Sequence, residues 1–189
     1  LLQRRETPDV HPPKVEPEGV LFEEKLSLAA RADGAAREAH SSISQVEVGY
    51  LDETQQVLIA NSEGLLAEDR RVRTRLSLVA VASDGGEMQV GRMSPGAMKG
   101  FEFYDEVDVE GSARRAAETA VTMLKAEYAP GGTMPVVIHN GFGGVIFHEA
   151  CGHGLEAYAV SQEATIFAEK MGEVVAGEAV TAVDDGSIP

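Results

Sequence analysis

Cysteine and basic residues are scarce in this chain of 189 residues. Cys151 is the only cysteine, so an internal disulfide is excluded, which fits a reducing cytoplasm. Lysine and arginine number 16 against 31 aspartates and glutamates, which gives a net charge of −15. Nucleic acids and anionic membranes bind basic surfaces, so we expect neither of them as a direct partner.

Long apolar runs are also missing. The longest candidate, residues 134–147, is interrupted by His139, Asn140 and several glycines, well short of the ~20 apolar residues that cross a bilayer. The composition is instead that of a soluble globular protein, with 43% hydrophobic and 25% charged residues.

The order of periodic segments predicts an α+β chain, in which an antiparallel sheet with two flanking helices precedes the start of a second α+β domain. Residues 1–18 hold four prolines among charges and predict a linker or the remnant of an N-terminal domain. Residues 19–128 predict a middle domain. Residues 129–189 open with the helix breaker APGG and predict the start of a truncated second domain, so we expect a piece of a longer protein.

The middle domain carries both helical and strand periodicity. Apolar residues at helical spacing predict helices over residues 20–40 and 110–127. Alternation predicts an antiparallel meander with turns at 61–64 and 84–86, its strands covering residues 44–50, 54–60, 70–83 and 87–93. The arginines within 70–75 could form an anion site, but the alternation favours the solvated face of a strand.

The second domain begins with a continuous apolar run, residues 134–138, which predicts a strand buried on both faces. Residues 145–158 predict a buried helix, 163–173 an exposed helix or loop, and 178–187 a strand followed by a turn. The intervening GFGG matches no complete phosphate-binding pattern, because both GxxxxGK[ST] and GxGxxG are absent. Its glycines therefore predict a tight turn rather than a nucleotide site.

The segment FHEACGH places His148 and His153 around Glu149. A catalytic zinc takes three protein ligands and an open position for water, and a nearby carboxylate serves as general base. The histidines of H-E-x-x-H lie ~40° apart on a helix, whereas a spacing of five gives ~140° on an ideal α-helix. Gly152 and Gly154 flank His153, so we expect a π-type distortion that brings both imidazoles together.

Two other interpretations of the histidines remain open. They could be hydrogen-bonded core residues, or they could belong to a structural metal site with four protein ligands and no water position. Charged Glu149 beside the apolar residues 145–147 would be costly to bury without a partner, which favours a metal site.

The third ligand is not evident from the motif. Glu156, three residues after His153, is the best candidate within the chain by helical position, and His139 could approach the start of the helix. Cys151 should point to another face, so we interpret it as a packing residue. Four further acidic residues could reach the site only through the fold, namely Glu163, Glu169, Asp184 and Asp185.

Two long stretches resemble the TldD/PmbA family, in particular its TldD-type subunit. They are PVVIHNGFGGVIFHEACGHGLEA and FAEKMGEVVAGEAVTAVDDGSIP, and the upstream VLIANSEGLLAEDRRVRTRLSLVAVASDGGEMQVG and GFEFYDE match the family's middle region. The resemblance covers the chain from about residue 19, and the motif H-E-x-x-x-H-G-L-E is specific.

The resemblance implies a cytosolic metallopeptidase subunit that degrades unstructured peptides and pairs with a PmbA/TldE-like partner or forms a homodimer. It makes His148 and His153 zinc ligands and Glu149 the general base, with a downstream cysteine beyond Pro189 as third ligand. We therefore expect zinc-dependent hydrolysis of short or unstructured peptides, with this chain inactive on its own. The alternative is a non-catalytic subunit that binds peptides by strand addition at a sheet edge.

Overall fold

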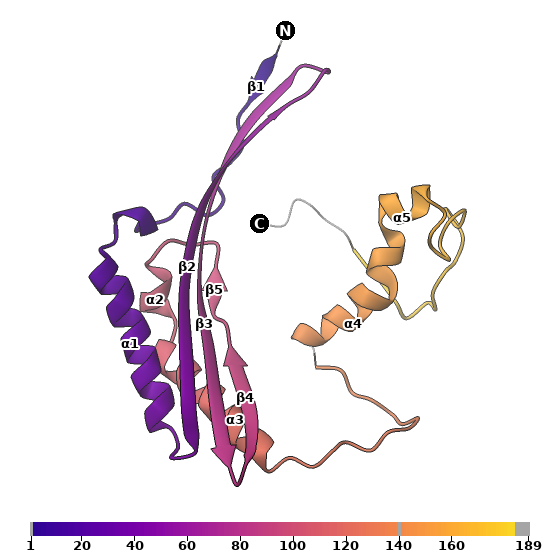
Figure 1. Cartoon of the computed structure of the whole chain (residues 1–189). Helices are drawn as coiled ribbons and strands as arrows, with labels where there is room; N and C mark the ends of the chain where they lie inside the picture. Colours follow the sequence, from indigo (N-terminus) through magenta and orange to yellow (C-terminus); the bar gives the residue numbers. More distant parts are fainter. Residues whose placement is uncertain (1, 140, 184–189) are drawn as a thin grey trace. The chain divides into compact units, whose positions relative to one another are not determined.

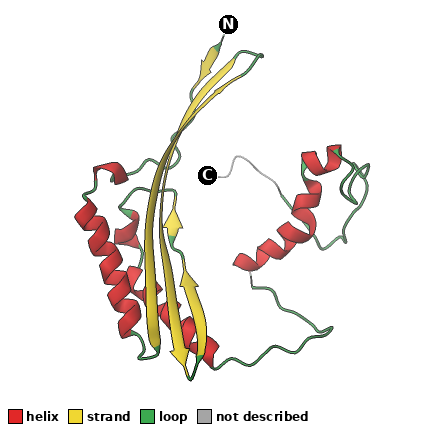
Figure 2. Ribbon diagram, viewed as in Figure 1, coloured by secondary structure: helices red, strands yellow, loops and turns green. Residues whose placement is uncertain are grey.

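The computed structural model describes residues 2–139 and 141–183. The chain divides into two compact units, the first ending at Tyr128 and the second beginning at Ala129, and Figures 1 and 2 show the elements of each. In the described ranges, no helix is both long and apolar enough to cross a membrane.

Unit 1 is built on a five-stranded sheet whose central strand is β3 (Leu65–Asp84) (Figure 1). The long β2 (Ile43–Ala60) runs antiparallel along one side of it. On the other side, β4 (Glu87–Met93) and β5 (Gly96–Ala97) pair antiparallel with β3, and β1 (Gln3–Arg5) pairs parallel with its first residues. The fold is α+β, as predicted, but the sheet is mixed rather than purely antiparallel.

β2 is a single strand where alternation predicted two. The residues between the two predicted strands do not turn, because their pairing with β3 continues without a break, and two ion pairs accompany it. Asp52 accepts a hydrogen bond from Lys25 Nζ at 2.7 Å, and Glu53 pairs with Arg73, which lies directly opposite on β3, at 2.8 Å. The predicted turns at 61–64 and 84–86 do connect β2 to β3 and β3 to β4.

Two predicted helices, α1 (Phe22–Glu38) and α3 (Val109–Leu124), cover one face of this sheet (Figure 2). Asp108 begins α3 by accepting the backbone N–H of Gly111 at 2.8 Å. The buried core joins even-numbered residues of β3 to small residues of both helices, chiefly Leu76, Leu78, Ala80, Ala32, Ala36, Ala113, Ala116 and Ala117. The small side chains let α3 approach the sheet so closely that a Cβ at Gly91 of β4 would overlap the carbonyl oxygen of Ala116.

The opposite face of β3 carries odd-numbered residues. Arg71, Arg73 and Arg75 are exposed there, as the alternation predicted for a solvated face. Arg71 pairs with Asp69 at 2.7 Å, and Arg73 with Glu53, so two of the three charges are already matched within the sheet.

The N-terminal segment, predicted to be a linker, is held to unit 1 by a buried carboxylate. Glu102, only 7% exposed, accepts the backbone N–H groups of Lys14, Val15 and Gly100 at 3.1, 2.9 and 3.2 Å. Burial raises the pKa of Glu102, but these hydrogen bonds outweigh it and hold the pKa below its ordinary value. The short helix α2 (Phe103–Glu106) follows directly.

Unit 2 is a broken helical segment among loops. Its elements are η2 (Phe142–Gly144), α4 (Val145–Phe147), the π-helix η3 (His148–Gly152), η4 (His153–Leu155) and α5 (Ala157–Ser161).

Three predictions for unit 2 are wrong. Residues 134–138 and 178–183 form no strand, and 184–187 lie outside the described residues. A strand needs a neighbour, and the described part of unit 2 contains no other strand; Val137 is 98% exposed instead. The predicted helix over 145–158 is neither regular nor buried: its side chains are largely exposed, and Glu156 interrupts it with extended backbone.

Candidate metal centre

The histidine motif lies on a π turn. The backbone N–H of His153 donates to the carbonyl oxygen of His148, the i→i+5 bond that defines a π-helix. This wider turn brings the two imidazole rings to a centroid separation of 4.3 Å, with the planes inclined at 68°. The predicted distortion is confirmed, and it removes the objection that a spacing of five sets the rings on different faces.

Gly152 contributes to this geometry through its lack of a side chain. Its φ of −57° and ψ of −51° are helical, so the residue does not use glycine's special backbone freedom. A Cβ at this position would lie 3.2 Å from Nδ1 of His148 and 3.5 Å from its Cγ. The His148 ring therefore folds back over the space that a larger residue would fill.

The three motif residues form one cluster. His148, Glu149 and His153 each offer a ligand atom, and these atoms lie within 4.8 Å of one another. Glu149 Oε2 is 3.7 Å from His153 Nε2. Ligand atoms of a tetrahedral zinc lie roughly 3.3 Å apart, a distance within reach of small rotations of these exposed side chains. Two imidazoles and a carboxylate are donors that suit a transition metal such as zinc.

Glu156 lies on the outer side of His153. Its Oε1 is 2.7 Å from Nδ1 of His153, whereas Nε2 of the same ring faces Glu149. The hydrogen bond and the negative charge of Glu156 raise the pKa of His153, with a smaller contribution from Glu149. The carboxylate thus contacts the ring nitrogen opposite the cluster, and Glu156 is not among the three residues whose ligand atoms converge.

The other candidate ligands are not brought to the cluster in the described part of the chain. Nδ1 of His139 accepts the backbone N–H of Gly141 at 3.0 Å. Cys151 is half-buried and stands outside the cluster, as do Glu163 and Glu169. Asp184 and Asp185 lie outside the described residues.

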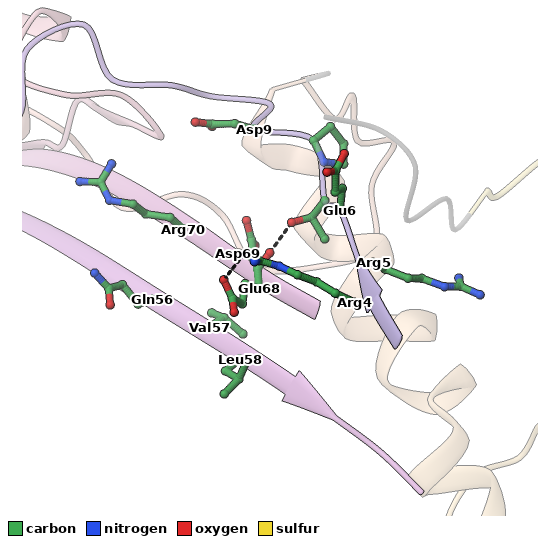
Figure 3. Close-up of a pocket in the computed structure, with 12 residues that line it drawn as sticks. Arg4, Arg5, Glu6, Asp9, Gln56, Val57, Leu58, Glu68, Asp69 and Arg70 are labelled. Atoms are coloured by element: carbon green, nitrogen blue, oxygen red, sulfur yellow. Dashed lines mark hydrogen bonds and ion pairs between the residues drawn. The ribbon is translucent and has the colours of Figure 1, made fainter. Parts of the chain in front are cut away.

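A separate cavity of about 870 Å³ lies in unit 1, where β1 meets the β2–β3 hairpin (Figure 3). Two of its arginines are paired: Arg4 with Glu68, and Arg70 with Glu16, both at 2.7 Å. None of the predicted site residues lines it.

Two family models match this chain. Residues 15–124 match the PmbA/TldA metallopeptidase central domain, and residues 131–189 match the PmbA/TldA metallopeptidase C-terminal domain. The chain belongs to the PmbA/TldD metallopeptidase family. The family is therefore one of metal-dependent peptidases, which agrees with a cluster of two histidines and a glutamate.

Similar proteins agree with this membership. A metalloprotease of Methanothermobacter thermautotrophicus is 39% identical over 172 residues, which are 91% of this chain and 37% of that protein. A metalloprotease TldD homolog of Haemophilus influenzae is 35% identical over 177 residues, 90% of this chain and 36% of its own length. The chain thus spans a little over a third of the length of these PmbA/TldD relatives.

A solved structure supports the fold. A Thermotoga maritima protein, named for a proposed role as modulator of a DNA gyrase, matches with a TM-score of 0.72 at 23% identity. The match covers 88% of this chain and 37% of that protein. At this identity the likeness concerns the architecture alone.

Proposed function

We propose that the chain is part of a zinc peptidase subunit that hydrolyses short or unstructured peptides in the cytoplasm. The observation that carries the proposal is the convergence of His148, Glu149 and His153 in a chain of a metallopeptidase family. His148 and His153 would hold the metal through neutral ring nitrogens.

Zinc bound at this cluster supplies a Lewis acid that lowers the pKa of a water molecule and polarises the scissile carbonyl. Glu149 is exposed, so water and an extended peptide can both reach its carboxylate. As general base it accepts the proton of the attacking water, and it donates that proton to the leaving amine when the peptide bond breaks.

The proposal includes a third ligand and a partner. Two imidazoles alone hold zinc weakly. The chain covers 37% of the Methanothermobacter relative. We therefore assign the third ligand, a cysteine, to a part of the family's sequence that this chain does not cover. The partner is a PmbA/TldE-like subunit, or a second copy in a homodimer. Residues 1–189 alone are then inactive.

The test uses the protein expressed from its complete reading frame, alone and with the partner subunit. Zinc content is measured by mass spectrometry, and cleavage is measured on an unstructured fluorogenic peptide. We expect Glu149→Gln to keep its zinc and to lose at least about 100-fold in kcat. His148→Ala loses both zinc and cleavage, and Glu163→Gln, an exposed control in the same unit, keeps both. Cleavage that persists in Glu149→Gln would refute the assigned base.

A peptide-binding scaffold is the second candidate, and one observation favours it. β2 pairs only with β3, so the other edge of this 18-residue strand is open among the described residues. An extended peptide could add a strand there. The scaffold predicts peptide binding without cleavage, and binding that the exchange Glu149→Gln leaves unchanged. A purely structural zinc predicts four protein ligands and no dependence of any cleavage on Glu149.

A further inference from the structure

Glu156 holds an unusual position for a carboxylate. It is the residue at which the helical segment ends, with φ of −62° and ψ of 137°, and it is also the N-cap of α5. Acidic side chains near helix N-termini commonly accept backbone N–H groups, yet the Glu156 side chain makes no cap hydrogen bond. It contacts Nδ1 of His153 at 2.7 Å instead.

We propose that Glu156 is a positioning residue for the metal: it accepts the Nδ1–H of His153 and thereby fixes Nε2 as the metal-binding nitrogen. A neutral imidazole has one N–H and one lone pair, so a proton held at Nδ1 leaves the lone pair at Nε2. Nε2 faces the cluster, 3.7 Å from Glu149 Oε2. The inference rests on the proposed function, because it concerns the same metal.

The backbone fixes Glu156 in this place. The Glu156 carbonyl oxygen accepts the N–H of Val160 at 3.0 Å, and its own N–H donates to the His153 carbonyl oxygen at 3.4 Å. The residue is therefore tied both to α5 and to the turn that carries His153. An oriented carboxylate on the second ring nitrogen sets the angle of the ring and strengthens its bond to a metal.

The two histidines are consequently held by different means. The His148 ring is seated over Gly152, where no side chain intrudes, whereas the His153 ring is held by a hydrogen bond. Loss of Glu156 should therefore weaken one ligand only. The loss should appear as a lower affinity for zinc and not as a failure of the proton transfer that Glu149 performs.

The experiment compares Glu156→Ala, Glu156→Gln and Glu156→Asp in the complete protein, with Glu178→Gln as the control. Glu178 is exposed and makes no ion pair in the described residues, so its exchange removes the same charge elsewhere in unit 2. The zinc affinity is measured by chelator competition at fixed pH. We expect a loss of about 10- to 100-fold for Glu156→Ala and no change for Glu178→Gln.

The other two variants separate hydrogen bonding from charge. Glutamine keeps an oxygen that can accept the Nδ1–H, so Glu156→Gln should retain most of the affinity. Aspartate keeps the charge but is one methylene too short to reach the ring, so Glu156→Asp should resemble Glu156→Ala. The reverse order would overturn the proposal in favour of a general electrostatic effect.

Two further measurements distinguish positioning from other roles. Excess zinc should restore the kcat of Glu156→Ala, while it should not restore that of Glu149→Gln. The visible absorption of bound Co²⁺ should be alike in wild type and Glu156→Gln. A changed coordination number would make Glu156 a ligand and overturn the proposal.

The proposed function and this inference can fail separately. If wild type binds no zinc, the proposed function fails. If wild type binds zinc and Glu156→Ala binds it equally well, this inference alone fails.

Discussion

The two units differ in what holds their side chains in place. In unit 1, residues of β3 such as Leu76 are fully buried against the alanines of α1 and α3. In unit 2, large apolar residues stay exposed, with Val137 at 98% and Met171 at 97%. The motif of unit 2 nevertheless has a defined geometry, because one π turn and one side-chain hydrogen bond set it locally.

Packing and local hydrogen bonds can therefore be disturbed separately in this chain. Changes in unit 1 should appear in the free energy of unfolding. Changes in the motif should appear in the metal affinity, with little effect on the unfolding of unit 1.

Gly91→Ala should have the largest effect. An added Cβ would overlap backbone atoms of α3 at Ala116, which cannot rotate away, so the helix must move off the sheet. We expect a loss of about 3 kcal/mol in the free energy of unfolding, measured by urea denaturation. Gly34→Ala is the control: its Cβ meets nothing within 4 Å on α1, and it should stabilise by about 0.5–1 kcal/mol. Equal destabilisation by both would contradict close packing at Gly91.

Glu102→Gln should cost about 2 kcal/mol, because the amide cannot accept all three backbone N–H groups that the carboxylate accepts. The pKa of Glu102 is lowered on folding, so its contribution is complete above the ordinary value of 4.5 and is lost as the pH falls toward the folded value. The difference between wild type and variant should therefore shrink below pH 4.5 in acid unfolding. Glu106→Gln, which breaks only an exposed pair with Lys99, should change stability by less than about 1 kcal/mol. If the stability difference between wild type and Glu102→Gln instead grows as the pH falls, the assignment of a lowered pKa to Glu102 is wrong.

Gly152→Ala should have the smallest effect of the three exchanges, and this effect should be confined to the metal affinity. The added Cβ pushes the His148 ring by a few tenths of an ångström, so we expect about a 10-fold loss of zinc affinity in calorimetric titration. Gly144→Ala, whose Cβ meets nothing within 4 Å, should bind zinc normally. Urea unfolding of unit 1 should be the same in both variants, and a shift there would show that the two units are not independent.

Most of unit 1 could be predicted from the sequence, because its helices and strands bury their apolar faces against one another. Alternation located β3, the turn that follows it indicated β4 as a hairpin partner, and apolar residues at helical spacing located α3. The continuous β2 was missed because residues 51–53 break the alternation in the sequence, whereas their pairing with β3 continues through them. The three-residue β1 is too short to show any period.

In unit 2 the local prediction succeeded and the non-local ones failed. The spacing of His148 and His153 with the adjacent glycines indicated the π turn, which depends on a few neighbouring residues. The strand over residues 134–138 was wrong because strand formation depends on a distant partner that an apolar run does not reveal. The place of Glu156 could not be decided by helical position, because the backbone leaves the helix at that residue and the carboxylate binds the outer nitrogen of His153.

The π turn changes how such motifs can be recognised. It takes up one extra residue between the histidines within a single widened turn, so their rings keep the neighbourhood that four-residue spacing gives on an α-helix. Spacing along the chain and spacing on the helix surface are therefore different quantities. A sequence search for metal-binding histidine pairs should therefore not be limited to a spacing of four residues. It should also accept histidines five residues apart where a small residue such as Gly152 leaves room for the ring.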